Sequence, residues 1–370
     1  MVSPFSAQVL AYLQAVHDAP RPMGPSVLDG LPGVVRERTV YRWQRSLGSR
    51  LAYFPSLSLS GLGLVHAHVF LDGATDRWAA LPVVLAASWV NHGLERPGLY
   101  LHCAVPVGAE GAFEQLVRTL VGDGWADAST IVLAGDGWQS FGRLVECLDG
   151  HGRIRAQRSP LEALRDGFFR ASSEQRGLLR SYPFVVPAVF EAVEERCSLQ
   201  EVWRRAYERL GRLVWRYFPR GTRRWPVNGK RYVRHAQELL VGAGLFRQNI
   251  IRYLPFLDHG LEAFVVLPAS AGPLGELVRL FGRVCPVVEV APGHDGRVVV
   301  RLVGGDEAVY EVLRVAREVA RPLGVWVRDA RRTGALLGRV RFAYERFFDP
   351  GTGVWRFPAE EILAGLRGAS

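Results

Sequence analysis

The sequence predicts an α+β fold of two tandem units, each a basic, helix-rich block followed by a block with the order strand–helix–strand–strand–helix–strand. Its 370 residues are enough for about two or three domains of ordinary size. Residues 198–257 carry 13 basic and 3 acidic side chains, whereas residues 61–150 carry 4 and 10. Hydrophobic periodicity gives the same order of elements twice. Basic modules therefore alternate with neutral or acidic ones.

The first mixed block covers residues 62–134. Alternating and helical periodicities predict a strand at 64–71, a helix at 77–90, hairpin strands at 89–95 and 98–105, a second helix at 110–121 and a last strand at 129–134. This order is the ferredoxin-like βαββαβ arrangement.

The second mixed block repeats that order. The predicted elements are a strand at 261–267, a helix at 272–284, hairpin strands at 287–291 and 297–303, a helix at 306–319 and a strand at 324–328. The hairpin strand at 297–301 is rich in β-branched residues, and Pro, Gly and Asp fill the turn before it. A second ferredoxin-like unit is therefore expected.

Each mixed block follows a segment in which three helices and a closing strand are predicted. In the first, a helix at 36–47 leads to an extended segment at 51–59. In the second, a capping box at 198–201 opens one helix, another covers 230–241, and a strand passes through Ile250, Ile251 and Tyr253. Three helices and a strand, found twice, predict two winged helix-turn-helix modules.

The sequence Val233-Arg-His-Ala-Gln-Glu-Leu-Leu240, continuing to Gly244-Leu-Phe246, resembles the recognition helix and the step into the wing of the Lrp/AsnC family of transcription regulators. The resemblance spans residues 1–147 and about 185–328. It implies DNA-binding winged helix-turn-helix modules joined to ferredoxin-like ligand-binding and dimerisation domains. This chain departs from the family in carrying two such units, an insertion at 211–227 and a C-terminal tail.

These predictions divide the chain into six segments. They are a winged helix-turn-helix at 1–60, a ferredoxin-like domain at 61–150, a helical linker at 151–184, a second winged helix-turn-helix with a basic insertion at 185–258, a second ferredoxin-like domain at 259–330 and a C-terminal extension at 331–370.

The candidate DNA-binding side chains are nearly all arginines, whose planar fork suits phosphates and guanine edges. The resemblance places basic residues of both recognition helices in the major groove. The insertion adds arginines interleaved with aromatic residues, a pattern that also suits single strands. The predicted residues are Arg36, Arg38, Arg42, Arg45, Arg220, Arg223, Arg224, Lys230, Arg231 and Arg234. Double-stranded DNA is the predicted partner, and a small-molecule effector stays an open alternative, although no residues here match the family's effector pocket.

A second candidate surface is the face of each sheet that its helices leave uncovered. Because side chains alternate along a strand, His66, His68 and Phe70 share a face with Tyr100 and His102. The corresponding face of the second unit carries Glu262, Phe264 and Arg301. We expect the two sheets to pack face to face as an intrachain pseudo-dimer, with His66 or His68 pairing with Glu262 when protonated; a homodimer is the alternative. Three histidines could bind zinc, but no carboxylate or cysteine accompanies them, so no metal or cofactor is predicted.

No motif commits the chain to catalysis. It has no Walker A loop, no Gly-x-Ser-x-Gly and no His-Glu-x-x-His, so no catalytic residue is predicted. A histidine-dependent endoribonuclease on tandem ferredoxin-like folds, using an exposed histidine such as His235, is the alternative enzyme; a protein-interaction scaffold is the alternative binding module. The four cysteines are far apart and predicted to be buried free thiols. With no transmembrane or signal segment recognised, a cytoplasmic protein is expected.

Overall fold

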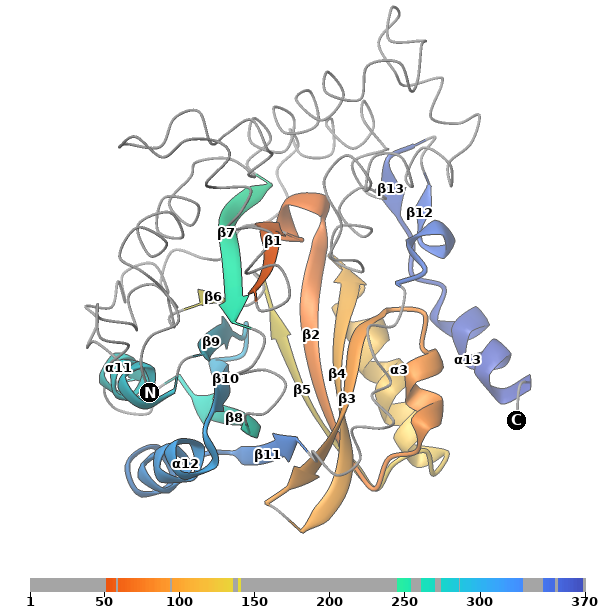
Figure 1. The fold of residues 1–370 in the computed structure, drawn as a ribbon. Helices are drawn as coiled ribbons and strands as arrows, with labels where there is room; N and C mark the ends of the chain where they lie inside the picture. Colours follow the sequence, from red (N-terminus) through yellow and green to blue (C-terminus); the bar gives the residue numbers. More distant parts are fainter. Residues whose placement is uncertain are drawn as a thin grey trace, which may run out of the picture.

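The computed structural model describes residues 51–57, 59–93, 95–135, 139–140, 245–253, 261–269, 274–285, 287–328, 342–349 and 352–368. Within them, nine strands form one antiparallel sheet in the order β5-β2-β4-β3-β11-β8-β10-β9-β6 (Figure 1). Together with the helices, this makes an α+β structure. The segments predicted to form helices before each sheet block, at 1–50 and 185–244, and the linker at 151–184 lie outside the described residues.

The first half of the sheet has the strand order β5-β2-β4-β3. Its elements are β2 (Leu64–Asp72), β3 (Val84–His92), β4 (Arg96–Pro106), α3 (Glu110–Gly122) and β5 (Ala128–Ala134). The helix predicted at 77–90 is wrong, because only the short 3-10 helix η3 (Asp76–Ala80) occurs there and β3 begins at Val84. Alanines make this segment look helical, but pairing with β4 satisfies the backbone groups of both strands, and this tertiary contact outweighs the local propensity.

The second half has the strand order β11-β8-β10-β9. Its elements are β8 (Leu261–Pro268), α11 (Leu274–Val284), β9 (Val287–Pro292), β10 (Arg297–Gly304), α12 (Asp306–Ala320) and β11 (Gly324–Arg328). Each end lies within two residues of the prediction. In both halves, therefore, the strands stand in the order fourth, first, third and second along the chain.

The two halves are joined edge to edge. Strand β3 pairs with β11 through Trp326 and His92, Val327 and Asn91, and Arg328 and Val90. The prediction of two separate sheets is therefore wrong, but the two uncovered faces do pack against each other within the chain, through residues such as Phe70 and Phe264. Separate sheets would leave unpaired N–H and C=O groups along the edges that β3 and β11 now share, and a continuous sheet satisfies them.

The sheet also curls until its opposite ends meet. Ala134, at the end of β5, bridges Gly293, and the N–H of His294 donates to the carbonyl of Leu133 over 2.8 Å. A Cβ on Gly293 would lie 2.7 Å from a methyl carbon of Val132 on β5 and 2.8 Å from the carbonyl oxygen of Arg297, so this close approach requires glycine. The short strand β6 (Gln139–Ser140) pairs antiparallel with β9 and forms the last strand at that end of the sheet.

Curling gives the sheet an inner face shared by both halves and two outer faces covered separately. Helices α11 and α12 lie on one side of the molecule, and α3 lies on the other (Figure 1). Each outer face has its own apolar core. The inner face has a third core to which both halves contribute; its members include Phe70, Tyr100, Phe264, Val299 and Trp326.

The C-terminal segment packs on the first half. It contains η6 (Tyr344–Arg346), β12 (Phe348–Asp349), β13 (Val354–Trp355) and α13 (Ala359–Gly368). Phe342 and Phe347 are buried in the outer core of the first half, and Phe357 packs against Phe113 of α3. These rings supply apolar cover on the half that has only η3 between its first two strands, where the second half has α11.

A separate two-stranded ribbon consists of β1 (Leu51–Leu57) and β7 (Phe246–Tyr253) (Figure 1). The strands are antiparallel, with Leu51 opposite Tyr253 and Leu57 opposite Phe246. Both follow a predicted basic block. Extended structure was predicted for both segments, but their pairing with each other was not.

We expect Trp326→Ala to destabilise the protein by about 3–5 kcal/mol, the usual cost of removing a buried tryptophan. Trp326 is 2% exposed, stacks on Phe70 of the other half at 4.2 Å and donates its indole N–H to Asp72. The measurement is urea unfolding. Tyr310→Ala, at an exposed position of α12, is the control and should cost under about 1 kcal/mol. A similar small loss for both variants would contradict a shared inner core.

Candidate functional site

The inner face of the sheet changes from apolar to polar toward one end. On β2, the residues of odd number lie in the outer core of the first half, so His66, His68 and Phe70 point inward. His68 is the cross-strand partner of His102, and Phe70 is the partner of Tyr100. The alternation predicted from the sequence therefore places these side chains on one face.

The three histidines form a stack. The His102 ring lies 5.0 Å from the rings of both His66 and His68, with interplanar angles of 15° and 9°. His66 Nδ1 and His102 Nε2 are hydrogen-bonded at 2.7 Å, and His68 Nδ1 and the Tyr100 hydroxyl at 2.9 Å. The stack and the hydroxyl thus form one connected polar cluster within the sheet, which we call the histidine cluster.

Burial controls the protonation of this cluster. Burial, and then the neighbouring His66, hold the pKa of His68 well below its usual value. Burial also raises the pKa of Tyr100 well above its ordinary value, although Arg301 acts in the opposite direction. A neutral His68 and a protonated Tyr100 are therefore favoured, so the hydroxyl can donate to the imidazole nitrogen.

A second inner cluster, which we call the charged cluster, comes from the other half of the sheet. Arg301 on β10 donates to Glu262 over 2.5 Å and to Glu289 over 2.7 Å, and Arg328 on β11 donates to Glu262 over 3.2 Å. Glu262 is 6% exposed and Glu289 is 1% exposed. Burial would lower the pKa of Arg301, but Glu262 and Glu289 outweigh it and raise that pKa, so Arg301 stays charged.

The predicted ion pair between Glu262 and a protonated His66 or His68 is not the one that forms. Both carboxylate oxygens of Glu262 accept from arginines, and burial disfavours a charged His68. Phe264 instead links the second half to the histidine cluster, since its ring stacks on Tyr100 at 4.2 Å. Phe70 and Phe264 lie 5.8 Å apart between ring centres.

Three residues at the junction of the halves were missed by sequence reasoning. Asp72, the last residue of β2, contacts His92 at 2.8 Å and accepts the indole N–H of Trp326 at 3.3 Å, and the His92 and Trp326 rings stack. No sequence pattern pairs residues so far apart. Glu289 was detectable, because a carboxylate within the apolar strand 287–291 requires a buried partner.

Neither a metal centre nor a reactive thiol is found in the part of the chain that the structure describes. Among the described residues, no group of three or more His, Cys, Asp and Glu side chains is arranged to hold a metal ion. Cys103 and Cys285 are buried free thiols, as predicted for them, and burial raises the pKa of Cys285 to about 12. Thiols held protonated in this way are poor nucleophiles.

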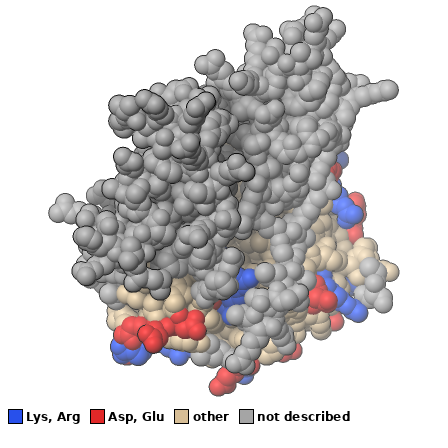
Figure 2. Space-filling model, in the orientation of Figure 1, with Lys and Arg blue, Asp and Glu red and all other residues tan. Residues whose placement is uncertain are grey.

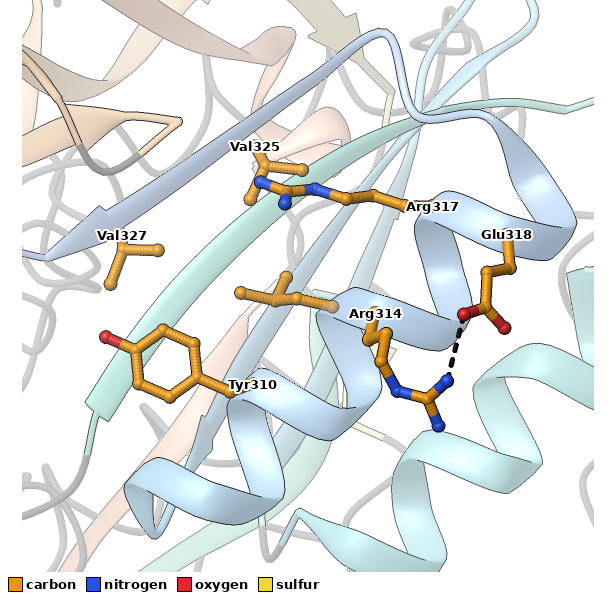
Figure 3. Close-up of a pocket in the computed structure, with 7 residues that line it drawn as sticks. Tyr310, Arg314, Arg317, Glu318, Val325 and Val327 are labelled. Carbon is orange, nitrogen blue, oxygen red and sulfur yellow. Dashed lines mark hydrogen bonds and ion pairs between the residues drawn. The ribbon is translucent and has the colours of Figure 1, made fainter.

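A pocket lies on the outer side of the second half, between α12 and β11 (Figure 3). Its volume is about 240 Å³, and it is lined by Tyr310, Leu313, Arg314, Arg317, Glu318, Val325 and Val327. Arg314 is turned toward Glu318, with which it forms an ion pair, and Arg317 lies over Val325 (Figure 3). The pocket is smaller than the roughly 300–1,000 Å³ of ordinary ligand sites.

Helix α12, on the same outer face, carries four acidic and two basic side chains. Figure 2 shows acidic side chains gathered where α12 lies in Figure 1, and this helix contains Asp306, Glu307, Glu311 and Glu318. A surface of this sign repels phosphates. This excess of negative charge disfavours phosphate binding along α12.

The predicted nucleic-acid interface adjoins the β1–β7 ribbon in the sequence. The predicted DNA-binding residues, Arg36 to Arg45 and Arg220 to Arg234, and the alternative catalytic residue His235 lie outside the described residues. The ribbon fixes where the two basic blocks enter the described structure. Because β1 and β7 are antiparallel, Leu51 and Phe246 begin at opposite ends of the ribbon, about 20 Å apart at the rise of a strand.

Comparison with known proteins gives no relative. The chain matches no protein-family model, no curated protein and no solved structure. Among the described helices, none combines the length and the apolar character needed to cross a membrane.

We expect stability to fall as the pH drops below about 6.5, because the unfolded chain then binds a proton that the folded chain excludes from His68. The loss continues down to the lowered pKa of His68 in the folded state. Urea midpoints from pH 8 to pH 5 measure it. His68→Gln should reduce the dependence on pH, whereas His294→Gln, at an exposed position, should not. Equal pH profiles for wild type and His68→Gln would contradict a neutral, buried His68.

We expect Arg301→Met to cost about 3–5 kcal/mol, since it leaves two buried carboxylates without their common cation. Arg314→Met is the matched control: Arg314 also lies between two carboxylates, Glu311 and Glu318, but is exposed, so its loss should cost under about 1 kcal/mol. Denaturant unfolding measures both. Similar losses for both variants would show that burial does not determine how much the charged cluster contributes to the free energy of unfolding.

Proposed function

We propose that this protein is a double-stranded DNA-binding transcription regulator in which one chain supplies both DNA-binding modules. The two halves of the curled sheet act as an intrachain pseudo-dimer of ferredoxin-like units. In support, each half has the strand order fourth, first, third, second, and the halves share the inner core. Each ferredoxin-like unit is preceded by a predicted winged helix-turn-helix module.

The observation that carries the proposal is the antiparallel pairing of β1 with β7. These strands occupy equivalent places in the two repeats, at the end of each basic block. Antiparallel pairing of equivalent strands relates these two strands by a local two-fold axis. Regulators that read two half-sites on a duplex present their recognition helices with this symmetry. The ribbon therefore favours two modules that face one duplex together.

The charge of the basic blocks fits the same partner. Residues 198–257 carry 13 basic and 3 acidic side chains, whereas the outer helix α12 is acidic. Neutralising phosphates supplies most of the affinity of such proteins for nucleic acid. The blocks differ in sequence, so the two half-sites are expected to differ as well.

The test is binding of the full chain to duplex DNA, single-stranded DNA and structured RNA of equal length, followed by fluorescence anisotropy. Duplex should bind most tightly. If the second block contacts about five phosphates, log affinity should fall with log salt with a slope near −4 to −5. Arg220, Arg223 and Arg224 replaced together by Ala should give a shallower slope.

A matched control removes three exposed arginines from the outer helices, Arg118, Arg314 and Arg317, and should leave the slope unchanged. Selection from randomised duplexes should then return two unlike half-sites, with one chain bound per duplex. Equal weak binding to all three nucleic acids would overturn the proposed function. RNA cleavage that is lost in His235→Ala would favour the endoribonuclease instead.

A further inference from the structure

The segment that connects the ribbon to the sheet, which we call the joint, is largely buried. Residues 58–63 separate the end of β1 from the start of β2. Leu59 and all three residues of η2 (Ser60–Leu62) are buried. The N–H of Leu64 donates to the carbonyl of Leu59, and the N–H of Gly63 donates to that of Ser60. Connecting segments are usually exposed, so burial here indicates a joint with a defined direction.

The C-terminal segment contacts this joint through Trp355. The indole N–H of Trp355 donates to the carbonyl of Leu62 over 2.6 Å. Gly63 has a φ of +75°, a left-handed conformation that favours glycine, and a Cβ there would lie 3.5 Å from the indole ring. From the other side, the N–H of Val107 donates to the carbonyl of Gly63. The joint is thus held between Trp355 and the residue that follows β4.

Trp355 is itself held in place by the short hairpin β12–β13. It is the cross-strand partner of Phe348, whose ring lies 4.9 Å away, and the N–H of Arg356 donates to the carbonyl of Phe347 over 2.7 Å. The ring of Phe342 lies 6.2 Å away. The indole therefore has fixed neighbours on its own segment.

The segment is fastened to the first half on both sides of Trp355. Before it, the N–H of Ala343 donates to the carbonyl of Pro82 over 3.0 Å. After it, Arg367 on α13 contacts Asp123 at the end of α3 over 2.7 Å. Because the segment is anchored on both sides of Trp355, the position of the indole relative to the joint is fixed.

We infer that the C-terminal segment is a clamp on this joint, with Trp355 as a positioning residue that sets the direction in which β1 leaves the sheet. Since β1 is paired with β7 along its length, the clamp orients the whole ribbon. This orientation of the ribbon requires no ligand. If the chain binds DNA, which rests on the proposed function, the clamp also sets the spacing at which two half-sites are read.

The first measurement is amide hydrogen exchange in the full chain. Trp355→Phe keeps a ring but removes the indole donor. It should speed exchange of the Gly63 and Leu64 amides about 3- to 10-fold, the size expected for one lost hydrogen bond, and leave Leu101 in β4 unchanged. The control is Phe357→Leu, which alters the same segment away from the joint and should leave both amides unchanged. Unchanged exchange at Gly63 and Leu64 in Trp355→Phe would overturn the clamp.

The second measurement reports ribbon direction. Spin labels at Ser56→Cys on β1 and Arg118→Cys on α3, with the four native cysteines replaced, give a distribution of distances between strand and helix. The clamp predicts a narrow distribution that broadens in Trp355→Phe but not in Phe357→Leu. Equal widths in all three proteins would overturn it, even if the joint amides exchange faster.

A third measurement concerns DNA binding and is independent of the first two. For the wild type, inserting about five base pairs, half a helical turn, between selected half-sites should abolish cooperative binding, and Trp355→Phe should tolerate the insertion. A broadened distribution without any duplex binding supports the clamp and overturns the proposed function alone. Duplex binding with the same spacing preference in both proteins overturns the link between clamp and DNA reading.

Discussion

The pairing of β3 with β11 is the contact on which the rest of the described structure depends. It is short, with three residue pairs, but it makes two four-stranded halves into one sheet. Only a continuous sheet can curl until Ala134 meets Gly293. The curl in turn buries Phe70, Tyr100, Phe264 and Trp326 against one another, a surface too apolar to leave in water.

The two polar clusters explain why this sheet has one register. Arg301 on β10 contacts carboxylates on β8 and β9, and Arg328 on β11 shares Glu262, so one network crosses four strands. A slip of one residue in any of them would turn its charged side chain to the outer face. The histidine cluster acts in the same way on β2 and β4. Buried polar groups are costly unless every partner is present, so each cluster penalises alternative pairings.

The two halves of the sheet are covered differently on their outer faces. The second half is covered by α11 and α12, whereas the first has α3, η3 and the aromatic side chains of the C-terminal segment. The outer core of the first half therefore includes side chains from the C-terminal segment. The clamp follows from it, because the segment that completes the outer core also reaches Leu62. A covering role and a positioning role are thus combined in one segment.

The sequence by itself determined the elements of the second half, the α+β class and the faces of the strands. Those features depend on local periodicity, and the β-branched run at 297–301 strongly favours a strand over a helix. It failed at 77–90, where alanines favour a helix and only the distant strand β4 decides for β3. His66, His68 and Tyr100 could be placed on one face because side chains alternate along a strand. Which edge pairs with which, that Glu262 takes arginines rather than histidines, and that Trp355 reaches Leu62 were decided by tertiary structure, because they depend on residues brought together from up to 293 positions apart.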